Sequence, residues 1–172
     1  EAKIGKQPII AEDLGFLTDS VKKLLADSGF PGMKVFELGF DSRDTNGNGY
    51  QPHNFIRDCV AYTGTHDNET IVGWWKSITA AERKLARDYL CDHATPEEEL
   101  YQCFISLIMR SAARVCVIPM QDYMGLDNRF RMNKPSTVGT NWKWRIKKRD
   151  LTKKLQKEIY DVTLRYGRKN WD

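Results

Sequence analysis

The chain has 172 residues, 41% of them hydrophobic, which is enough for one domain with a buried core. Its formal net charge is only +4, and the basic residues that gather after position 143 are interrupted by Glu158 and Asp161 at helical spacing. We therefore expect a solvated helix face there and no nucleic-acid partner. No apolar run approaches the roughly 18 residues of a membrane span, and there is no signal-peptide pattern, which predicts a cytoplasmic chain with no membrane partner.

The first predicted elements are a strand, a helix and a second strand. The apolar run 8–11 predicts a short buried strand, and it ends at the carboxylates Glu12 and Asp13. Thr18 is placed to cap a helix whose apolar residues recur at i, i+3 and i+4, and Gly29 is placed to end it. The apolar and aromatic run 33–40 predicts the second strand. The short connections indicate a right-handed parallel unit.

A polar stretch, YTGTHDNET at 62–70, follows the apolar run 59–61, which predicts a third short buried strand. An imidazole and two carboxylates thus lie where a strand leaves its sheet, and in an α/β barrel that is the mouth where chemistry is done. A His66–Asp67 pair there could orient a substrate hydroxyl or stabilise a developing cation. Alternatively, this is a polar loop in which Asp67 or Asn68 caps the next helix. The stretch alone does not decide between the two.

The second half is predicted to be mainly helical. Thr79 with Glu82 predicts a capping box, and Thr-Pro-Glu-Glu at 95–98 predicts another, with proline at the first helical position. The apolar run 114–120 is typical of a fourth buried parallel strand. A final helix is predicted over about 150–166. The helix after 95–98 is expected to turn five residues to the core: Leu100, Phe104, Leu107, Ile108 and Ala112.

Two patterns that could suggest metal sites do not hold. The four cysteines lie far apart with no CxxC pair, so we expect neither a disulfide nor a metal centre, in keeping with a reducing compartment. The stretch 44–49, DTNGNG, mimics the start of an EF-hand loop, yet its twelfth position is Phe55, where a bidentate Glu is required. We expect no metal and no cofactor, and we interpret 41–49 as a mobile loop that borders a substrate cleft.

Several segments together resemble one family. The stretch 62–70 followed by GWW is similar to the corresponding segment of the 4-alpha-glucanotransferases (amylomaltase or disproportionating enzyme), glycoside hydrolase family 77. Six further segments agree in order: IIAEDLG at 9–15, PGMKV at 31–35, PHNF at 52–55, PMQD at 119–122, RMN at 131–133 and NWKWR at 141–145. The resemblance covers nearly the whole chain and its joint specificity is high.

The resemblance implies that residues 1–172 form a single-domain α/β fragment. It would be the C-terminal half of a (β/α)8 TIM-type barrel, with four parallel strands and outer helices. A complete barrel takes about 250 residues, and the chain begins with Glu1 rather than Met, so we expect a fragment or a processed piece. Unpaired strand edges at 9–10 and 115–118 would then favour association with the missing N-terminal half, or self-association.

The resemblance also implies site roles in a retaining transfer between alpha-1,4-glucans and maltooligosaccharides. It makes Glu12 the acid/base and Asp67 the carboxylate that stabilises the transition state. His66 would bind hydroxyls of the transferred sugar, and Asn133 would lie on a substrate-lining loop. Glu12 and Asp13 could each serve as the acid on physical grounds. The motif places the acid at Glu12, which leaves Asp13 as a local hydrogen-bond acceptor and candidate substrate contact.

Two departures from the family pattern bear on activity. The family's nucleophile is an Asp in an Arg-x-Asp-His type motif, which this sequence lacks, so we expect residues 1–172 alone to be inactive. At 37–38, where family members commonly show a polar residue and then an aromatic, the chain has Glu37-Leu38.

Two other functions stay open. A hydrolase of the alpha-amylase clan would use the same residues, because transfer and hydrolysis differ in whether a sugar or water reaches the intermediate. A non-catalytic glucan-binding module would need no nucleophile, but it would not need an acid at Glu12 either.

The tryptophans are expected to serve packing more than sugar binding. The neighbours Trp74 and Trp75 point about 100° apart on a helix, so they cannot both face one sugar subsite, and we predict core packing for at least one. Trp142 and Trp144 are predicted to pack against the outer helices.

Overall fold

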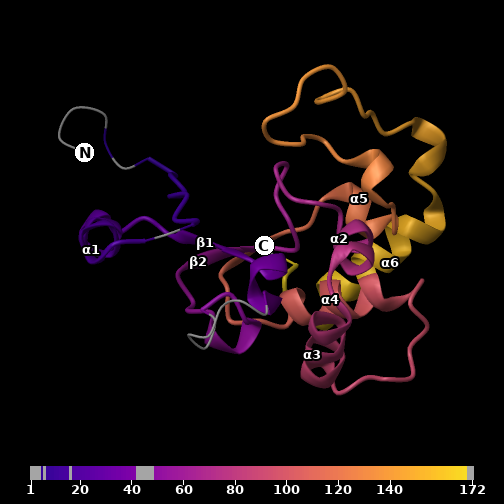
Figure 1. Cartoon of the computed structure of the whole chain (residues 1–172), viewed down its shortest axis with the longest axis horizontal. Helices are drawn as coiled ribbons and strands as arrows, with labels where there is room; N and C mark the ends of the chain where they lie inside the picture. Colours follow the sequence, from indigo (N-terminus) through magenta and orange to yellow (C-terminus); the bar gives the residue numbers. More distant parts are fainter. Residues whose placement is uncertain (1–4, 6, 16, 42–48, 170–172) are drawn as a thin grey trace.

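The computed structural model describes residues 5, 7–15, 17–41 and 49–169, so most of the loop predicted at 41–49 lies outside the described residues. In Figure 1 the colours follow the chain from the N-terminus to the C-terminus. The helices and strands are α1 (Asp19–Ser28), β1 (Gly32–Val35), β2 (Cys59–Tyr62), α2 (Ile71–Ser77), α3 (Ala80–Leu90), α4 (Leu100–Met109), β3 (Val115–Val117), α5 (Met120–Tyr123) and α6 (Lys153–Arg165). Short 3-10 helices lie at Phe36–Phe40, Pro52–Asn54, Asn128–Phe130 and Lys148–Asp150.

The described strands form one parallel sheet in the order β1-β2-β3, which confirms the predicted α/β class. The segment predicted as a first strand, 8–11, contributes only an isolated parallel bridge between Ala11 and Gly32. Ile9 and Ile10 are 42% and 48% exposed, so the prediction of a buried strand there is wrong. No other described strand lies beyond this edge to cover them.

The second strand is shorter than predicted, because β1 ends at Val35 and the chain continues as a 3-10 helix over Phe36–Phe40. The rings of Phe36 and Phe40 are 4.9 Å apart, and both are buried. In an extended strand, residues four apart would be about 13 Å apart. Coiling the chain therefore brings both rings into the same part of the core.

The core lies between the sheet and helices α2, α3 and α4, and much of it is aromatic. Trp74 and Trp75 are both buried, which confirms core packing for these two residues. Their rings pack against Phe104 with centroids 5.5 and 5.8 Å away. Contacts of this kind stabilise a core by about 0.5–1.5 kcal/mol per pair beyond the area that they bury.

The predicted helix caps are confirmed at two of three positions. Thr18 accepts a hydrogen bond from the N–H of Val21, and Thr79 forms a capping box with Glu82. The box predicted at 95–98 is wrong, since α4 begins only at Leu100. The hydroxyl of Thr95 instead donates to the carboxylate of Asp92 at 2.5 Å, and residues 97–99 form a turn ahead of the helix.

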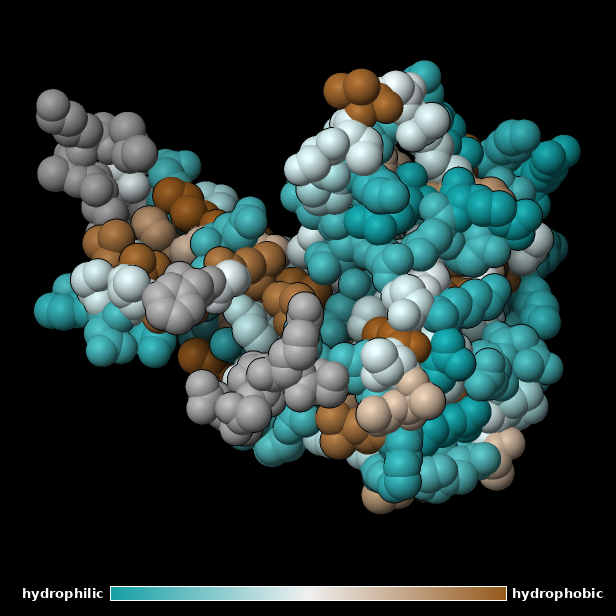
Figure 2. Space-filling view, viewed as in Figure 1, coloured by the Kyte–Doolittle hydropathy of each residue, from teal (hydrophilic) through white to brown (hydrophobic). Residues whose placement is uncertain are grey.

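Several apolar positions predicted to be buried are exposed at the two ends of the sheet. On α1 no residue is buried, and Leu24 is 69% exposed. Ala112 is also exposed, and the neighbouring Ala113 is buried in its place. The edge strand β3 exposes Val115 and Val117 by 43% and 42%, because no described strand pairs with its outer side. Figure 2 shows hydrophobic side chains gathered on the part that carries α1. The part that carries helices α2 to α6 is mostly hydrophilic on the same face.

Within the described ranges, no group of three or more His, Cys, Asp or Glu side chains is arranged to hold a metal ion. The four cysteines are all free. None of the helices in those ranges is both long and apolar enough to cross a membrane.

Candidate functional site

The loop that joins β2 to α2 presents His66 and Asp67 to solvent. A turn stabilised by Asn68 holds this loop, because its side-chain oxygen accepts from the N–H and the hydroxyl of Thr65 at 2.9 and 2.7 Å. Thr70 caps α2 by accepting from the N–H of Gly73. The alternative prediction, that Asp67 or Asn68 caps this helix, is therefore wrong. Asp67 is 48% exposed at its side chain and does not serve the helix.

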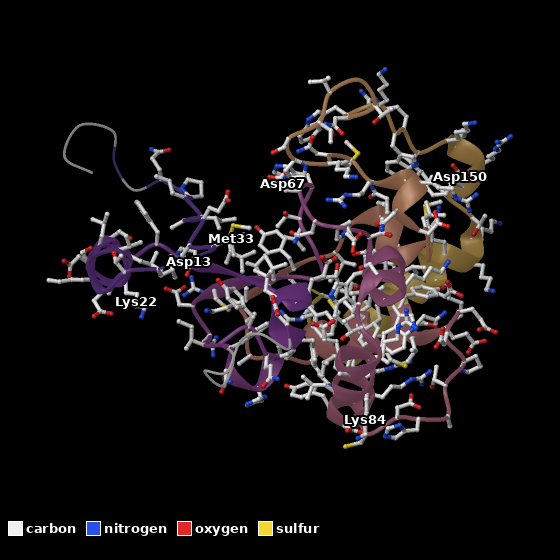
Figure 3. The ribbon with its side chains drawn as sticks, viewed as in Figure 1. Asp13, Lys22, Met33, Asp67, Lys84 and Asp150 are labelled. Atoms are coloured by element: carbon white, nitrogen blue, oxygen red, sulfur yellow. The ribbon has the colours of Figure 1, made fainter. Side chains whose placement is uncertain are left out.

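A second loop, after residue 130, binds the first and brings three predicted site residues together. Asn133 donates from its side-chain amide to the Asp67 carboxylate at 2.5 Å and from its backbone N–H to the carbonyl of His66 at 3.1 Å. Arg131 donates to the carbonyl of Asp67 at 2.8 Å. His66 Nε2 lies 3.4 Å from the Asp67 carboxylate. Figure 3 shows Asp67 where the two loops meet, above the sheet.

Trp142 adds an aromatic ring to this cluster. Its ring centroid lies 5.1 Å from that of His66, and the tryptophan is 51% exposed. The prediction that Trp142 packs against the outer helices is therefore wrong. The backbone N–H of Trp142 donates to the backbone carbonyl of Met132 at 2.6 Å. This hydrogen bond closes the loop and places the indole ring beside His66. Nothing local in the sequence indicated this pairing.

The adjacent carboxylates Glu12 and Asp13 differ in surroundings. Asp13 is only 8% exposed and accepts from the N–H of Met33 at 2.5 Å, which confirms its role as a local acceptor. Glu12 is exposed. It lies close enough to Tyr62, the last residue of β2, that its charge adds to the effect of burial and raises the pKa of that phenol. Figure 3 shows Asp13 next to Met33 at the start of the sheet.

Buried polar groups that the sequence analysis missed support the loop from below. Asp122 is fully buried and accepts from the hydroxyl of Thr63 at 2.5 Å and from the N–H of Ile71 at 2.8 Å. Burial raises the pKa of Asp122 to about 6 despite these two hydrogen bonds. Glu69, whose side chain is 27% exposed, also supports the loop, because it accepts from Asn128 at 2.7 Å and from Ser77 of α2 at 2.5 Å.

Glu37 is the second missed carboxyl, and it is 8% exposed. Its pKa is raised well above the ordinary value, first by burial and then by the negative charges of Asp122 and Glu69, whereas Arg131 lowers it. The sequence held one signal for this residue, a carboxylate inside the apolar and aromatic run 33–40, which also contains Lys34.

The loops enclose a pocket of about 200 Å³. It is lined by Thr65, His66, Asn68, Glu69, Thr70, Pro119, Gln121, Asp122, Arg131 and Met132. Eight of these ten side chains carry polar groups, and the other two are Pro119 and Met132.

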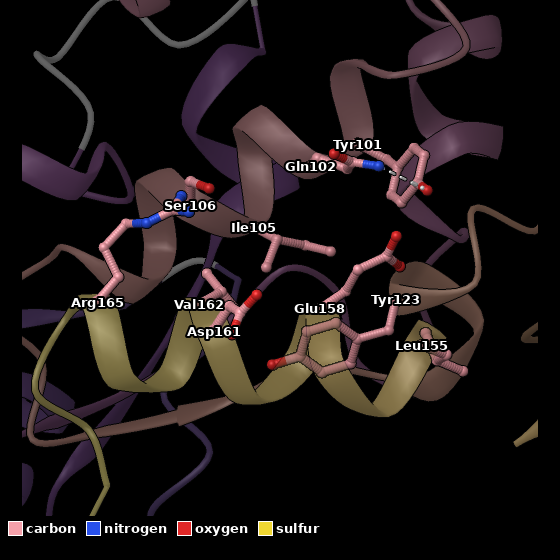
Figure 4. A pocket seen from close by; sticks show the side chains of 10 residues that line it. All are labelled: Tyr101, Gln102, Ile105, Ser106, Tyr123, Leu155, Glu158, Asp161, Val162 and Arg165. Carbon is pink, nitrogen blue, oxygen red and sulfur yellow. Dashed lines mark hydrogen bonds between the residues drawn. The ribbon is translucent and has the colours of Figure 1, made fainter. Parts of the chain in front are cut away.

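Another pocket, of about 170 Å³, lies between α4, α5 and α6 (Figure 4). Its polar side chains are partly exposed, and Gln102 donates to the hydroxyl of Tyr101 at 3.1 Å. It is a crevice between packed helices, and the site residues predicted from the sequence lie elsewhere.

Comparisons with known proteins agree on one family. A family model described as 4-alpha-glucanotransferase matches residues 1–152. The 4-alpha-glucanotransferase of Clostridium butyricum is 42% identical over 167 residues, which cover 96% of this chain and 34% of that protein. The enzyme of that name from Thermus thermophilus is 41% identical over 147 residues, which cover 83% of this chain and 29% of that protein.

A solved structure agrees with the sequence relatives. The amylomaltase from Streptococcus agalactiae, in complex with acarbose, has a TM-score of 0.90 and 39% identity. The match covers 98% of this chain and 34% of that one. The amylomaltase from Corynebacterium glutamicum, at 17% identity and a TM-score of 0.62, shares the fold. The chain thus spans about a third of the length of the relatives that it matches.

Proposed function

The chain belongs to the 4-alpha-glucanotransferase family, glycoside hydrolase family 77, and from this premise we propose that it takes part in glucan transfer. The reaction would move alpha-1,4-glucan segments to glucose or maltooligosaccharide acceptors by a retaining double displacement. Such a reaction needs a nucleophilic carboxylate and an acid/base carboxylate about 5 Å apart, with a transition state that resembles an oxocarbenium ion.

The observation that carries the proposal is the convergence of His66, Asp67 and Asn133. Asp67 is exposed and held in place by Asn133, so its negative charge is available to the positive charge that develops on the sugar. His66 has a half-exposed side chain and is suited to bind hydroxyls of the same sugar.

Glu12 is the proposed acid/base, because it is exposed at the edge of the sheet. The carboxylate of Asp13 is buried against the backbone of Met33. We therefore propose that Asp13 holds the backbone of Met33 and leaves substrate contact to other residues. We assign the nucleophile to no residue of this chain and propose that it lies outside residues 1–172.

Trp142 is proposed to extend the site as a surface for a sugar ring. The apolar faces of sugars pack against aromatic rings, and the half-exposed indole lies beside His66. A glucose unit bound by His66 would then have one face against this tryptophan.

The exposed edges of the sheet favour a larger assembly. Ile9 and Ile10 lie at one edge, and Val115 and Val117 at the other, and all four are 42–48% exposed. We propose that these edges pair with the N-terminal half of a (β/α)8 barrel, of which the described parallel sheet would form part. Self-association of the chain through the same edges is the alternative. Sedimentation that shows a monomer at high concentration would exclude self-association.

Incubation with maltotriose tests the proposal. The protein at its natural length should release glucose and form oligomers longer than maltotriose. An alpha-amylase-clan hydrolase would give glucose and maltose without longer products, and a binding module would give no products. Residues 1–172 alone should bind without turnover, and contaminant-free turnover by them would contradict the proposed roles.

A further inference from the structure

The carboxyl group of Glu37 lies directly beneath the turn that leads to Asp67. Its Oε1 atom is fully buried and has no hydrogen-bond partner among the described residues, although the backbone N–H of Glu69 approaches the carboxyl group and partly offsets the rise in its pKa. A Cβ atom added to Gly64 would lie 2.8 Å from this oxygen. The backbone at Gly64 therefore packs against the carboxyl of Glu37, three residues before Asp67.

Three other charged groups face Glu37 from three parts of the chain. Asp122 belongs to α5, Glu69 lies just before α2, and Arg131 follows the 3-10 helix Asn128–Phe130. Asp41 and Glu82 line a different, more open pocket that also reaches Glu37. Among the charged groups that affect Glu37, Arg131 is the one cation within the described part of the chain.

Glu37, Glu69 and Asp122 form an acid cluster, and Arg131 links this cluster to the loop that carries Asp67. One nitrogen of its guanidinium lies 3.8 Å from the carboxylate of Glu69, and another donates to the carbonyl of Asp67 at 2.8 Å. The side chain of Arg131 is 18% exposed, so water screens these contacts only partly. One guanidinium thus serves both the acid cluster and the backbone that carries Asp67.

A negative charge on Glu37 would disturb this arrangement. The charge would be buried without a hydrogen bond at Oε1, which is costly in a protein interior. It would also attract Arg131 away from Asp67 and repel the carboxylates of Glu69 and Asp122. A neutral carboxyl avoids all of these effects and keeps the same contact with Gly64.

We propose that Glu37 is a positioning residue for Asp67, in which a neutral buried carboxyl supports the Gly64 turn and leaves Arg131 bound to the site loop. Only the kinetic consequence of this inference rests on the proposed function. Because the pKa of Glu37 is raised, the neutral form favours the folded loop at low pH. That contribution to the stability of the loop is lost as the pH rises through the raised pKa of Glu37. The loop over 64–70 should therefore open more often at higher pH.

Hydrogen–deuterium exchange tests the inference without any glucan. The variants are Glu37→Gln, which keeps the shape but cannot ionise, and Glu97→Gln, which alters an exposed glutamate as a control. At equal pH, intrinsic exchange rates cancel between proteins. As the pH rises, the amides of 64–70 should exchange about fivefold faster in the wild type and in Glu97→Gln than in Glu37→Gln. Equal exchange in all three proteins at every pH would overturn the inference.

A carbon NMR titration of the wild-type protein covers the case in which Glu37→Gln does not fold. The Glu37 carboxyl carbon should titrate well above the ordinary range of a glutamate, and a midpoint within that range would overturn the inference. With the natural-length protein, Glu37→Gln should also keep transfer activity to higher pH than the wild type does. If wild type and Glu37→Gln exchange equally at 64–70 while the natural-length protein still transfers glucan, the role of Glu37 is rejected. An exchange difference without any transfer would reject the proposed function instead.

Discussion

The side-chain amide of Asn133 donates a 2.5 Å hydrogen bond to the carboxylate of Asp67, although 66 positions separate the two residues. The backbone N–H of Asn133 also binds the carbonyl of His66. One residue therefore fixes both the orientation of the proposed stabilising carboxylate and the path of the chain that carries it.

Replacing Asn133 with Ala should lower kcat/KM for maltotriose by about ten- to a hundredfold, because a hydrogen bond to a charged group contributes about 1.5–3 kcal/mol. Asn133→Asp should be at least as harmful, since it places a second negative charge against Asp67. Steady-state kinetics on the natural-length protein would measure both. Wild-type kinetics in both variants would show that Asn133 does not position Asp67.

Trp142→Ala should raise KM for maltooligosaccharides by about two- to tenfold, in line with 0.5–1.5 kcal/mol for an aromatic contact. Trp142→Phe keeps an aromatic surface and should recover most of the affinity. Trp144→Ala serves as the matched control, because Trp144 shows no ring contact with His66 among the described interactions. Equal losses in Trp142→Ala and Trp144→Ala would indicate that both act on loop structure and not on the sugar.

Asp122→Asn should change how stability depends on pH. Burial raises the pKa of Asp122 from its ordinary 3.8 to about 6, so the protonated acid favours the folded state. This contribution is present below pH 3.8 and is lost as the pH rises to about 6. From pH 4 to pH 7, the wild type should therefore lose about 2 kcal/mol of stability relative to Asp122→Asn.

Urea unfolding at a series of pH values would measure that difference. The asparagine can still accept from Ile71 and can donate to Thr63, so it should fold. Asp122→Ala removes the acceptor of the Ile71 N–H and should cost about 1–3 kcal/mol at every pH. A stability difference between wild type and Asp122→Asn that does not vary with pH would refute the account of this carboxyl.

Local patterns in the sequence predicted what local interactions decide. The caps at Thr18 and Thr79 depend on residues three positions away, and β2 depends on a short apolar run. Both kinds of signal lie within one stretch of chain. The parallel pairing of β2 and β3 agrees with the helices that lie between them, whereas β1 and β2 are joined in the described residues through 3-10 helices alone.

The features that the sequence did not reveal depend on contacts between distant residues. Glu37 and Asp122 are buried because loops from three regions close over them, and Trp142 reaches His66 through a loop closed at Met132. Ile9 and Val115 carry strand-like apolar patterns, but burial needs a neighbouring strand that the described residues do not supply. The joining of His66, Asp67 and Asn133 was expected from family resemblance and not from their spacing.

The central claim is that Glu12 and Asp67 have different chemical roles. General acid/base help contributes about 10²–10⁴-fold to a rate, so Glu12→Ala should lose about that much on a glucan donor. A glucosyl fluoride needs little protonation to leave, so the first step should survive in this variant and the intermediate should accumulate. Asp67→Asn weakens stabilisation of charge on the sugar in both steps, so a better leaving group should not help it.

The most direct measurement is azide rescue of the two variants, made in the natural-length protein, with a glucosyl fluoride donor, after circular dichroism has shown that both fold. Azide attacks the intermediate without a base. The account predicts that azide restores turnover in Glu12→Ala, with a glycosyl azide as product, and leaves Asp67→Asn slow. Rescue of Asp67→Asn together with no rescue of Glu12→Ala would show that the two roles are reversed.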